Sequence, residues 1–159
     1  MEIRGPNSDS FQVRVIGYHS APSGDDRESN LLRVYSRASF DGHAWTVIHP
    51  SLHTWEILEL ADWLETLAVS VPPRPEIKFL VPNISLEAQL WSEESVRLRV
   101  YFEREHRPIW LESSGAGSEV FIELECTPEE LKEWAGDLRQ QLEKFPLRGA
   151  RAAKSSTSR

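Results

Sequence analysis

The stretch VRLRVYFEREHR, residues 96–107, decides the fold that the sequence predicts. Apolar and polar side chains alternate along it, and successive side chains of a β-strand point to opposite faces. One face is therefore entirely apolar and the other is charged, as in an antiparallel strand with one face on the core and one in water. The apolar row consists of Val96, Leu98, Val100 and Phe102, and the polar row of Arg97, Arg99, Tyr101, Glu103 and Glu105.

Other segments of the chain have the composition of strands. β-branched and aromatic residues recur in short runs bounded by Gly, Pro, Asn, Asp or Ser, which is typical of strands joined by turns. Asp41-Gly42 predicts a hairpin turn between two of these runs. We expect strands at residues 11–18, 31–40, 43–48, 77–81, 84–91, 96–105 and 119–126.

Two segments change to the period of an amphipathic helix. Apolar residues recur at helical spacing over residues 57–68, with Thr54 as the expected N-cap. A second helix is expected to begin with Thr127 as the N-cap, Pro128 at the first helical position and Glu130 closing a capping box. The order of these elements indicates an α+β fold, with a mostly antiparallel sheet of about six to seven strands and two amphipathic helices packed on it.

Charge is distributed unevenly along the chain, whose formal net charge is −7. We expect a single domain over residues 1–147 and a basic, disordered tail over residues 148–159. The tail has four basic residues and no acid, which leaves the domain at about −11. An acidic domain disfavours non-specific binding of nucleic acid and accelerates the encounter with a basic protein.

The sequence also predicts a cytoplasmic location. It has no run of about eighteen apolar residues that could span a membrane. Its N-terminus has no apolar segment of the kind found in secretory signals. Cys126 is the only cysteine, so no internal disulfide can form, which is typical of a reducing compartment.

The ionisable residues form no recognisable catalytic or metal-binding pattern. Glu103, Glu105 and His106 come nearest to an acid–base set, but strand alternation would place His106 on the face opposite both glutamates. The three histidines from His43 to His53 lack the tight spacing of a zinc motif. We therefore expect a protein that is not an enzyme and has no catalytic residue, metal or cofactor.

Two charged groups are candidates for contacts with a protein partner. The first is an acidic loop between the first two expected strands, and the second is the polar row of the opening stretch. A sheet face that carries both signs of charge beside an aromatic residue can dock a protein, although solvation alone also accounts for both groups. The candidate contacts are Asp25, Asp26, Glu28, Arg97, Arg99, Tyr101, Glu103 and Glu105.

Short motifs follow one another in a distinctive order and spacing over residues 11–148. None of them is specific by itself. They are Gly17-Tyr18, Ser29-Asn30-Leu31-Leu32, Trp45-Thr46, Pro50-Ser51-Leu52, Thr54-Trp55-Glu56, ADWLETLA (61–68), FLVPNISLE (79–87), VYFERE (100–105), Arg107-Pro108, Trp110 and LRQQLEKFPLR (138–148). Together they resemble the WapI family of small bacterial proteins.

The resemblance implies a function that the residues alone do not reveal. The family takes its name from an immunity protein that neutralises the toxic C-terminal nuclease domain of a wall-associated toxin. By this resemblance we expect a cytoplasmic, non-catalytic binder that occludes a basic toxin domain. The alternative that the sequence leaves open is a structural or homo-oligomeric domain, such as a homodimer formed through strand edges, with no toxin partner.

Overall fold

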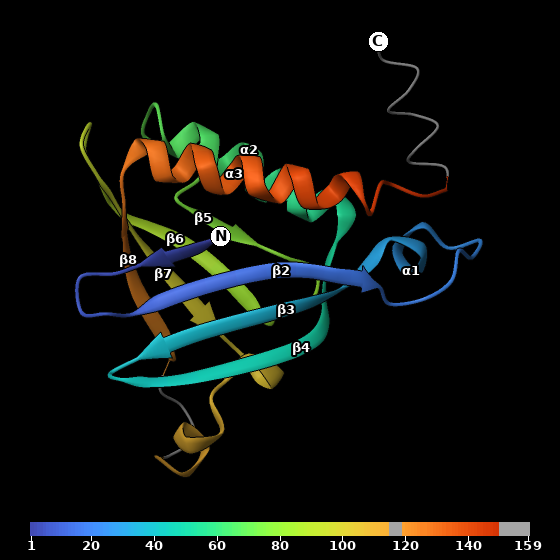
Figure 1. Cartoon of the computed structure of the whole chain (residues 1–159), viewed down its shortest axis with the longest axis horizontal. Coiled ribbons are helices and arrows are strands. Elements are labelled where there is room, and N and C mark those ends of the chain that lie inside the picture. Colours follow the sequence, from blue (N-terminus) through green and yellow to red (C-terminus); the bar gives the residue numbers. More distant parts are fainter. Residues whose placement is uncertain (115–118, 150–159) are drawn as a thin grey trace.

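The computed structural model describes residues 1–114 and 119–149 of the chain (Figure 1). Within these residues the chain forms eight strands, two long helices, one short helix and two 3₁₀ segments. In chain order they are β1 (Glu2–Arg4), β2 (Ser10–Tyr18), α1 (Asp26–Asn30), β3 (Leu31–Phe40), β4 (His43–His53), α2 (Thr54–Leu67), β5 (Glu76–Lys78), β6 (Ile84–Trp91), β7 (Val96–Phe102), η1 (Arg104–His106), η2 (Ile109–Ser114), β8 (Phe121–Cys126) and α3 (Pro128–Glu143).

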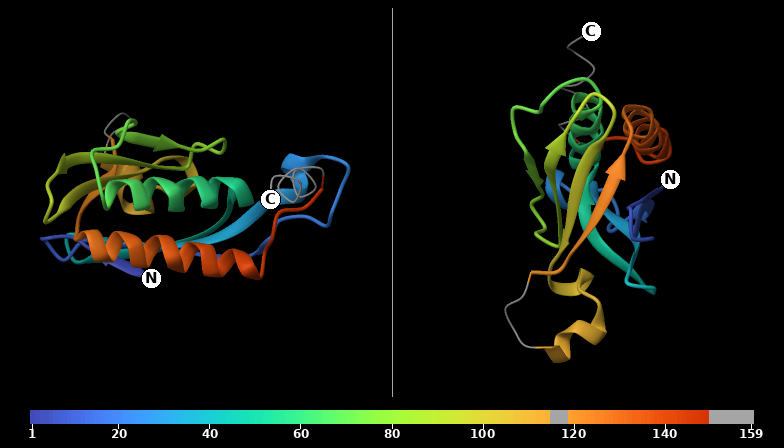
Figure 2. Two further views of the ribbon diagram at one scale, coloured as in Figure 1. Left: turned by 90° about the horizontal axis from the view of Figure 1, so that it is seen from above. Right: turned by 90° about the vertical axis from the view of Figure 1, so that its left-hand side faces the viewer.

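The strands form two antiparallel four-stranded sheets, with the orders β1-β2-β3-β4 and β5-β6-β7-β8. The sheets lie on opposite sides of a shared core, and α2 and α3 run side by side along the top of it (Figures 1 and 2). The predicted α+β class, the antiparallel pairing and the two amphipathic helices are confirmed. There are two sheets rather than one because α2 follows β4 directly and carries the chain across the core before β5 begins.

The two sheets meet where β1 lies against β8. A Cβ atom added to Gly5, the residue after β1, would lie 2.0 Å from the carbonyl oxygen of Glu123 in β8, so only glycine allows this approach. Behind this contact the ring of Phe11 packs edge-on against Phe102 of β7 and Trp134 of α3, with centroids 5.7 Å and 6.1 Å away. Both sheets and α3 therefore contribute to one core.

The start of α2 differs from the prediction. His53 occupies the N-cap position, and its backbone N–H donates to Glu56 Oε2 at 2.8 Å. The same carboxylate oxygen lies 2.7 Å from His53 Nδ1, and Glu56 Oε1 accepts the backbone N–H of Leu80 at 2.6 Å. The predicted cap, Thr54, is wrong because its buried hydroxyl donates instead to the carbonyl of Asn30 at 3.4 Å.

The start of α3 agrees with the prediction. Thr127 is the N-cap and accepts the backbone N–H of Glu130 at 3.2 Å, while the Glu130 carboxylate accepts the backbone N–H of Thr127 at 2.8 Å. On the surface between the two long helices, Arg139 of α3 donates to Asp62 and Glu65 of α2. These contacts fix the position of α3 beside α2.

The segment at residues 19–30, predicted as a loop, contains the short helix α1. The first residue of the predicted tail, Arg148, contacts this region: its backbone N–H donates to Asn30 Oδ1 at 2.8 Å. Its guanidinium lies 3.2 Å from the centroid of the Tyr18 ring. Residues 150–159, which make up most of the predicted tail, lie outside the described residues.

Candidate protein-binding surface

The outer face of the second sheet presents the polar row of β7. Arg97, Arg99 and Tyr101 are half-buried there, and the four apolar residues that alternate with them are buried. The register places Glu87 of β6 and Glu123 of β8 on either side of Arg99. The predicted division into an apolar and a polar row is confirmed over residues 96–102.

Pairing fixes the side chains of this face in one arrangement. Arg99 Nε and Nη2 both lie 3.0 Å from Glu123 Oε1, and the guanidinium lies 4.4 Å from the centroid of the Phe121 ring. The hydroxyl of Tyr101 donates to Glu87 Oε2 at 2.7 Å. Burial, and then the hydrogen bond to Glu87, raise the pKa of Tyr101 above its usual value. A surface that is already ordered loses less conformational entropy when a partner binds.

Glu103 and Glu105 do not lie on the strand, contrary to the prediction. β7 ends at Phe102 because β6 begins opposite it, at Ile84, so the following residues have no partner strand. The chain turns into η1, with both glutamates exposed and His106 fully buried. The three residues Glu103, Glu105 and His106 therefore do not converge, and they form no acid–base set.

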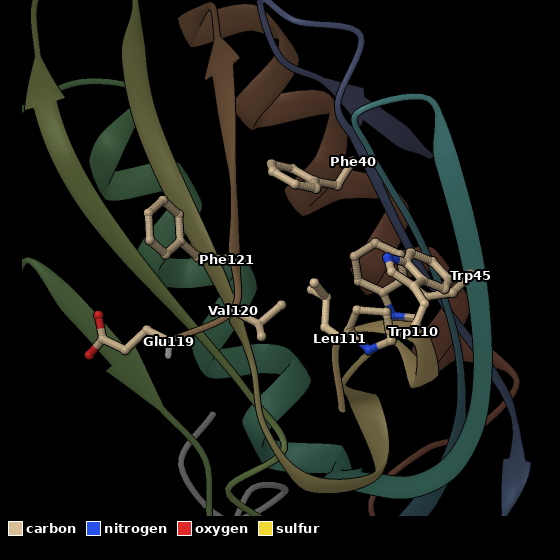
Figure 3. Close-up of a pocket in the computed structure, with 8 residues that line it drawn as sticks. Phe40, Trp45, Trp110, Leu111, Glu119, Val120 and Phe121 are labelled. Carbon is tan, nitrogen blue, oxygen red and sulfur yellow. The ribbon is translucent and has the colours of Figure 1, made fainter. Parts of the chain in front are cut away.

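An aromatic pocket of about 240 Å³ opens where β8 begins (Figure 3). Phe40 comes from the end of β3, Trp45 from β4, and Trp110 from η2, so segments of both halves of the chain form its walls. Phe40 is 43% exposed and Trp110 is 39% exposed. The pocket is lined by Phe40, Trp45, Pro108, Trp110, Leu111, Glu119, Val120 and Phe121.

Contacts between aromatic rings stabilise the walls of the pocket. The Trp45 ring lies edge-on to Phe102 and to Trp110, with centroids 5.0 Å and 5.5 Å away. Its indole N–H donates to the carbonyl of His106 at 2.9 Å. In Figure 3 the carboxylate of Glu119 points away from the two indoles, so the space between the rings is apolar. It suits an apolar side chain of a partner.

Phe121 connects the pocket with the outer face of β7. The residue lines the pocket, and Figure 3 shows its ring pointing away from Phe40 and the two indoles. The ring stands under the guanidinium of Arg99 and lies 5.5 Å from the ring of Tyr101. We call these two adjoining areas together the β7–pocket surface and define it by five residues. They are Phe40, Arg99, Tyr101, Trp110 and Phe121. An aromatic centre with a rim of paired charges is the usual composition of a protein interface.

The three acidic candidates lie together on α1. Asp25 is the N-cap, and its Oδ1 accepts the backbone N–H groups of Arg27 at 2.7 Å and Glu28 at 3.4 Å. Asp25 and Glu28 are exposed, whereas Asp26 is half-buried. Figure 1 and the left view of Figure 2 place α1 beyond the end of β2, away from β7 and β8. The structure thus separates the two groups of candidate contacts that the sequence suggested.

A buried polar cluster joins β4 to η1. Ser51 Oγ lies 3.4 Å from His106 Nε2 and 3.3 Å from His49 Nδ1, while Asn83 Nδ2 lies 3.1 Å from His49 Nδ1. Asn83 Oδ1 and His106 Nδ1 have no hydrogen-bond partner among the described residues. Burial, and then repulsion by His49, lower the pKa of His106 to about 4, so this imidazole is neutral at pH 7.

The aromatic pocket and the polar cluster were both missed from the sequence. The polar cluster brings together β4, the β5–β6 turn and η1. The pocket brings together the ends of β3 and β4 at their hairpin, η2 and the start of β8, and these segments too are far apart in the sequence. The sequence did contain one indication of the pocket. Two of the motifs that resemble the WapI family contain Trp45 and Trp110, and large aromatic residues tend to pack together. Nothing in the sequence indicated which of them would face one another.

The amino-acid sequence matches the model of the immunity protein WapI-like family over residues 2–146. The chain belongs to this family. Membership confirms the resemblance seen in the motifs and supports an immunity role in general, exercised on a protein partner. Immunity protein families are generally non-catalytic. Neither a curated protein nor a solved structure matches the chain.

In this WapI-like protein, residues 1–114 and 119–149 contain no group of three His, Cys, Asp or Glu side chains placed to hold a metal ion. No helix in the same part of the chain is long and apolar enough to cross a membrane. Cys126 is buried without a disulfide, and burial raises the pKa of its thiol to about 12. Its thiol is thus protonated at pH 7.

Proposed function

We propose that the protein is a non-catalytic immunity protein that binds a basic toxin domain, such as a nuclease, and covers the surface with which that domain acts. The single observation that carries this function is the match to the WapI-like immunity protein family over residues 2–146. The structure supports it with the β7–pocket surface, which is ordered, partly apolar and accessible.

The two groups of candidate contacts have different roles in this proposal. The β7–pocket surface makes the direct contact, because its pocket can hold an apolar side chain and its rim can exchange charge pairs with the toxin. Arg97 precedes Arg99 on β7, and Glu103 and Glu105 follow Tyr101 at η1. The acidic residues of α1 accelerate the encounter with a basic domain from a distance. Those residues are Asp25, Asp26 and Glu28.

Protection of a growing culture tests the function. The neighbouring genes are searched for a toxin domain, which is then expressed from an inducible promoter with and without this protein. Survival and complex formation are measured. We expect survival and a one-to-one complex only when the protein is present. Neutralising the acids of α1 with Asp26→Asn and Glu28→Gln should slow association without abolishing binding; Asp25 is kept because it caps α1. Toxicity that is unaffected by the protein would contradict the immunity role.

The alternative of a homo-oligomeric domain has one structural feature in its favour. β4 is an edge strand of eleven residues, and Ile48 on it is 52% exposed. Such an edge can pair with the same strand of a second copy. Sedimentation velocity of the purified protein distinguishes the two functions. A dimer that persists on dilution, and that remains a dimer when a toxin domain is added, would favour the alternative.

A further inference from the structure

The outer face of the first sheet is positively charged, although the chain as a whole has a net charge of −7. Arg14 of β2 and Arg33 and Arg37 of β3 are exposed on this face, which is turned to the viewer in Figure 1. Among the described residues, none of these three arginines forms an ion pair. Alternation leaves Tyr35 between Arg33 and Arg37, and the guanidinium of Arg14 lies 5.0 Å from the centroid of its ring.

Apolar side chains lie among the arginines. Ile16 of β2 is 38% exposed, and Ile48 of β4, which pairs with Tyr35, is 52% exposed. We call the area formed by all six side chains the arginine face. Its members are Arg14, Ile16, Arg33, Tyr35, Arg37 and Ile48. Arginine and tyrosine are enriched at protein interfaces relative to the rest of the protein surface.

One end of the arginine face is hollowed. A pocket of about 330 Å³ is lined there by Arg4, Arg37 and three serines. Glu2 also lines it, and its Oε2 lies 3.4 Å from Nη2 of Arg4, so one carboxylate already lies against an arginine of this pocket. Guanidinium groups can bind a carboxylate with two parallel hydrogen bonds.

We propose that the arginine face binds an acidic segment of a protein, with carboxylates of that segment paired to Arg14, Arg33 and Arg37. Charge complementarity selects an anionic partner. The exposed isoleucines favour a protein over a nucleic acid, because a sugar–phosphate backbone cannot use apolar contacts of this kind. The acidic remainder of the chain repels a long polyanion as well. The sheet that carries this surface lies on the opposite side of the core from β7 (Figure 2), so an acidic segment can bind here whether or not a toxin covers the outer face of β7.

Fluorescence anisotropy with three labelled probes tests this surface at low and at physiological salt. The probes are a peptide of alternating glutamate and leucine, the same peptide with glutamine for glutamate, and single-stranded oligo-dT. A variant carrying Arg14→Gln, Arg33→Gln and Arg37→Gln removes the charge of the face. The matched control carries Arg74→Gln, Lys132→Gln and Lys144→Gln, which removes the same charge from exposed positions elsewhere.

The acidic peptide should bind the wild-type protein and the matched control equally, and more weakly as salt is added. Its affinity for the arginine-face variant should fall by about tenfold, since three surface charge pairs are lost. Tighter binding of oligo-dT than of the acidic peptide would overturn the assignment to a protein. Three results would overturn the proposal itself. The glutamine peptide could bind as tightly as the acidic peptide, the matched control could lose as much affinity as the arginine-face variant, or no probe could bind.

Discussion

The outer faces of the two sheets are built on similar strands, β3 and β7, but they differ in whether their arginines are paired with carboxylates. β3 and β7 each alternate buried residues, all apolar except Ser36, with arginines and one tyrosine. On β7 the neighbouring strands place Glu87 and Glu123 opposite Arg99, whereas on β3 they place Gln12 and Thr46 opposite Arg37. A strand sequence therefore fixes which side chains face solvent, but the register of its neighbours decides whether their charges are neutralised.

The two outer faces differ only as long as the sheets keep their positions in the fold. Of the substitutions considered, Gly5→Ala should disturb those positions most. The new Cβ would lie 2.0 Å from the carbonyl oxygen of Glu123, which can only be relieved by moving β1 away from β8. We expect a loss of about 3 kcal/mol or more in the free energy of unfolding, at the upper end for overpacking. Urea unfolding followed by tryptophan fluorescence measures it.

Gly24→Ala is the matched control for that substitution. No atom lies within 4 Å of a Cβ added at Gly24, so this variant should unfold within about 0.5 kcal/mol of the wild type. Equal stabilities of the two alanine variants would show that the close approach of β1 and β8 does not hold the sheets together.

Acid should weaken the polar cluster that joins the sheets. The pKa of His106 is lowered to about 4 in the folded protein, and that of an unfolded histidine is about 6.5. Above pH 6.5 the imidazole is neutral in both states and contributes no pH dependence. As the pH falls from about 6.5 to about 4 the unfolded chain takes up the proton first, so stability falls by up to about 3 kcal/mol.

His106→Gln isolates this contribution from the carboxylates that titrate at similar pH. The difference in unfolding free energy between wild type and variant should shrink as the pH is lowered from 7 to 4, because only the wild type gains a proton on unfolding at this position. A difference that stays constant with pH would show that folding does not lower the pKa of His106.

A double-mutant cycle on Arg99→Ala and Glu123→Ala measures the neutralised face directly. The two groups are 31% and 34% exposed, so solvent screens their attraction, and we expect a coupling of about 0.5 kcal/mol that decreases with salt. A coupling energy of zero would show that the pairing of Arg99 with Glu123 does not stabilise the fold, so the two faces would not differ in this respect.

Arg37→Gln on the other face should have the smallest effect. Arg37 has no carboxylate partner among the described residues and lies on the same face as Arg14 and Arg33, so its removal relieves repulsion. We expect no loss of stability, or a gain of a few tenths of a kcal/mol, in the same urea experiment. A loss comparable with that of Arg99→Ala would mean that an interaction of Arg37 stabilises the fold.

The sequence predicted the elements of this fold better than their junctions. Alternation over residues 96–102 and the capping box at Thr127 are local patterns, and both are confirmed. The end of β7 at Phe102 depends on where β6 begins, and the cap of α2 depends on what buries Thr54. Such contacts join segments distant in the chain, so no local period reports them.

The candidate contacts show the same limit. Sequence alternation correctly placed Arg97, Arg99 and Tyr101 on the outer face of the strand, but it could not show that Phe121 lies between them and an aromatic pocket. The sequence also showed that the domain is acidic overall, but it did not show where the basic face of the domain lies. Whether the candidates bind a partner stays a prediction that needs the toxin.

Calorimetric titration with a toxin domain identified among the neighbouring genes tests the central claim most directly. Tyr101→Ala and Trp110→Ala, made together, remove the centre of the β7–pocket surface, while Val69→Ala removes an apolar side chain, 68% exposed, from the chain just after α2. The double variant should bind about thirtyfold more weakly or worse, and Val69→Ala should bind like the wild type. An unchanged affinity of the double variant would contradict the β7–pocket surface as the site of binding.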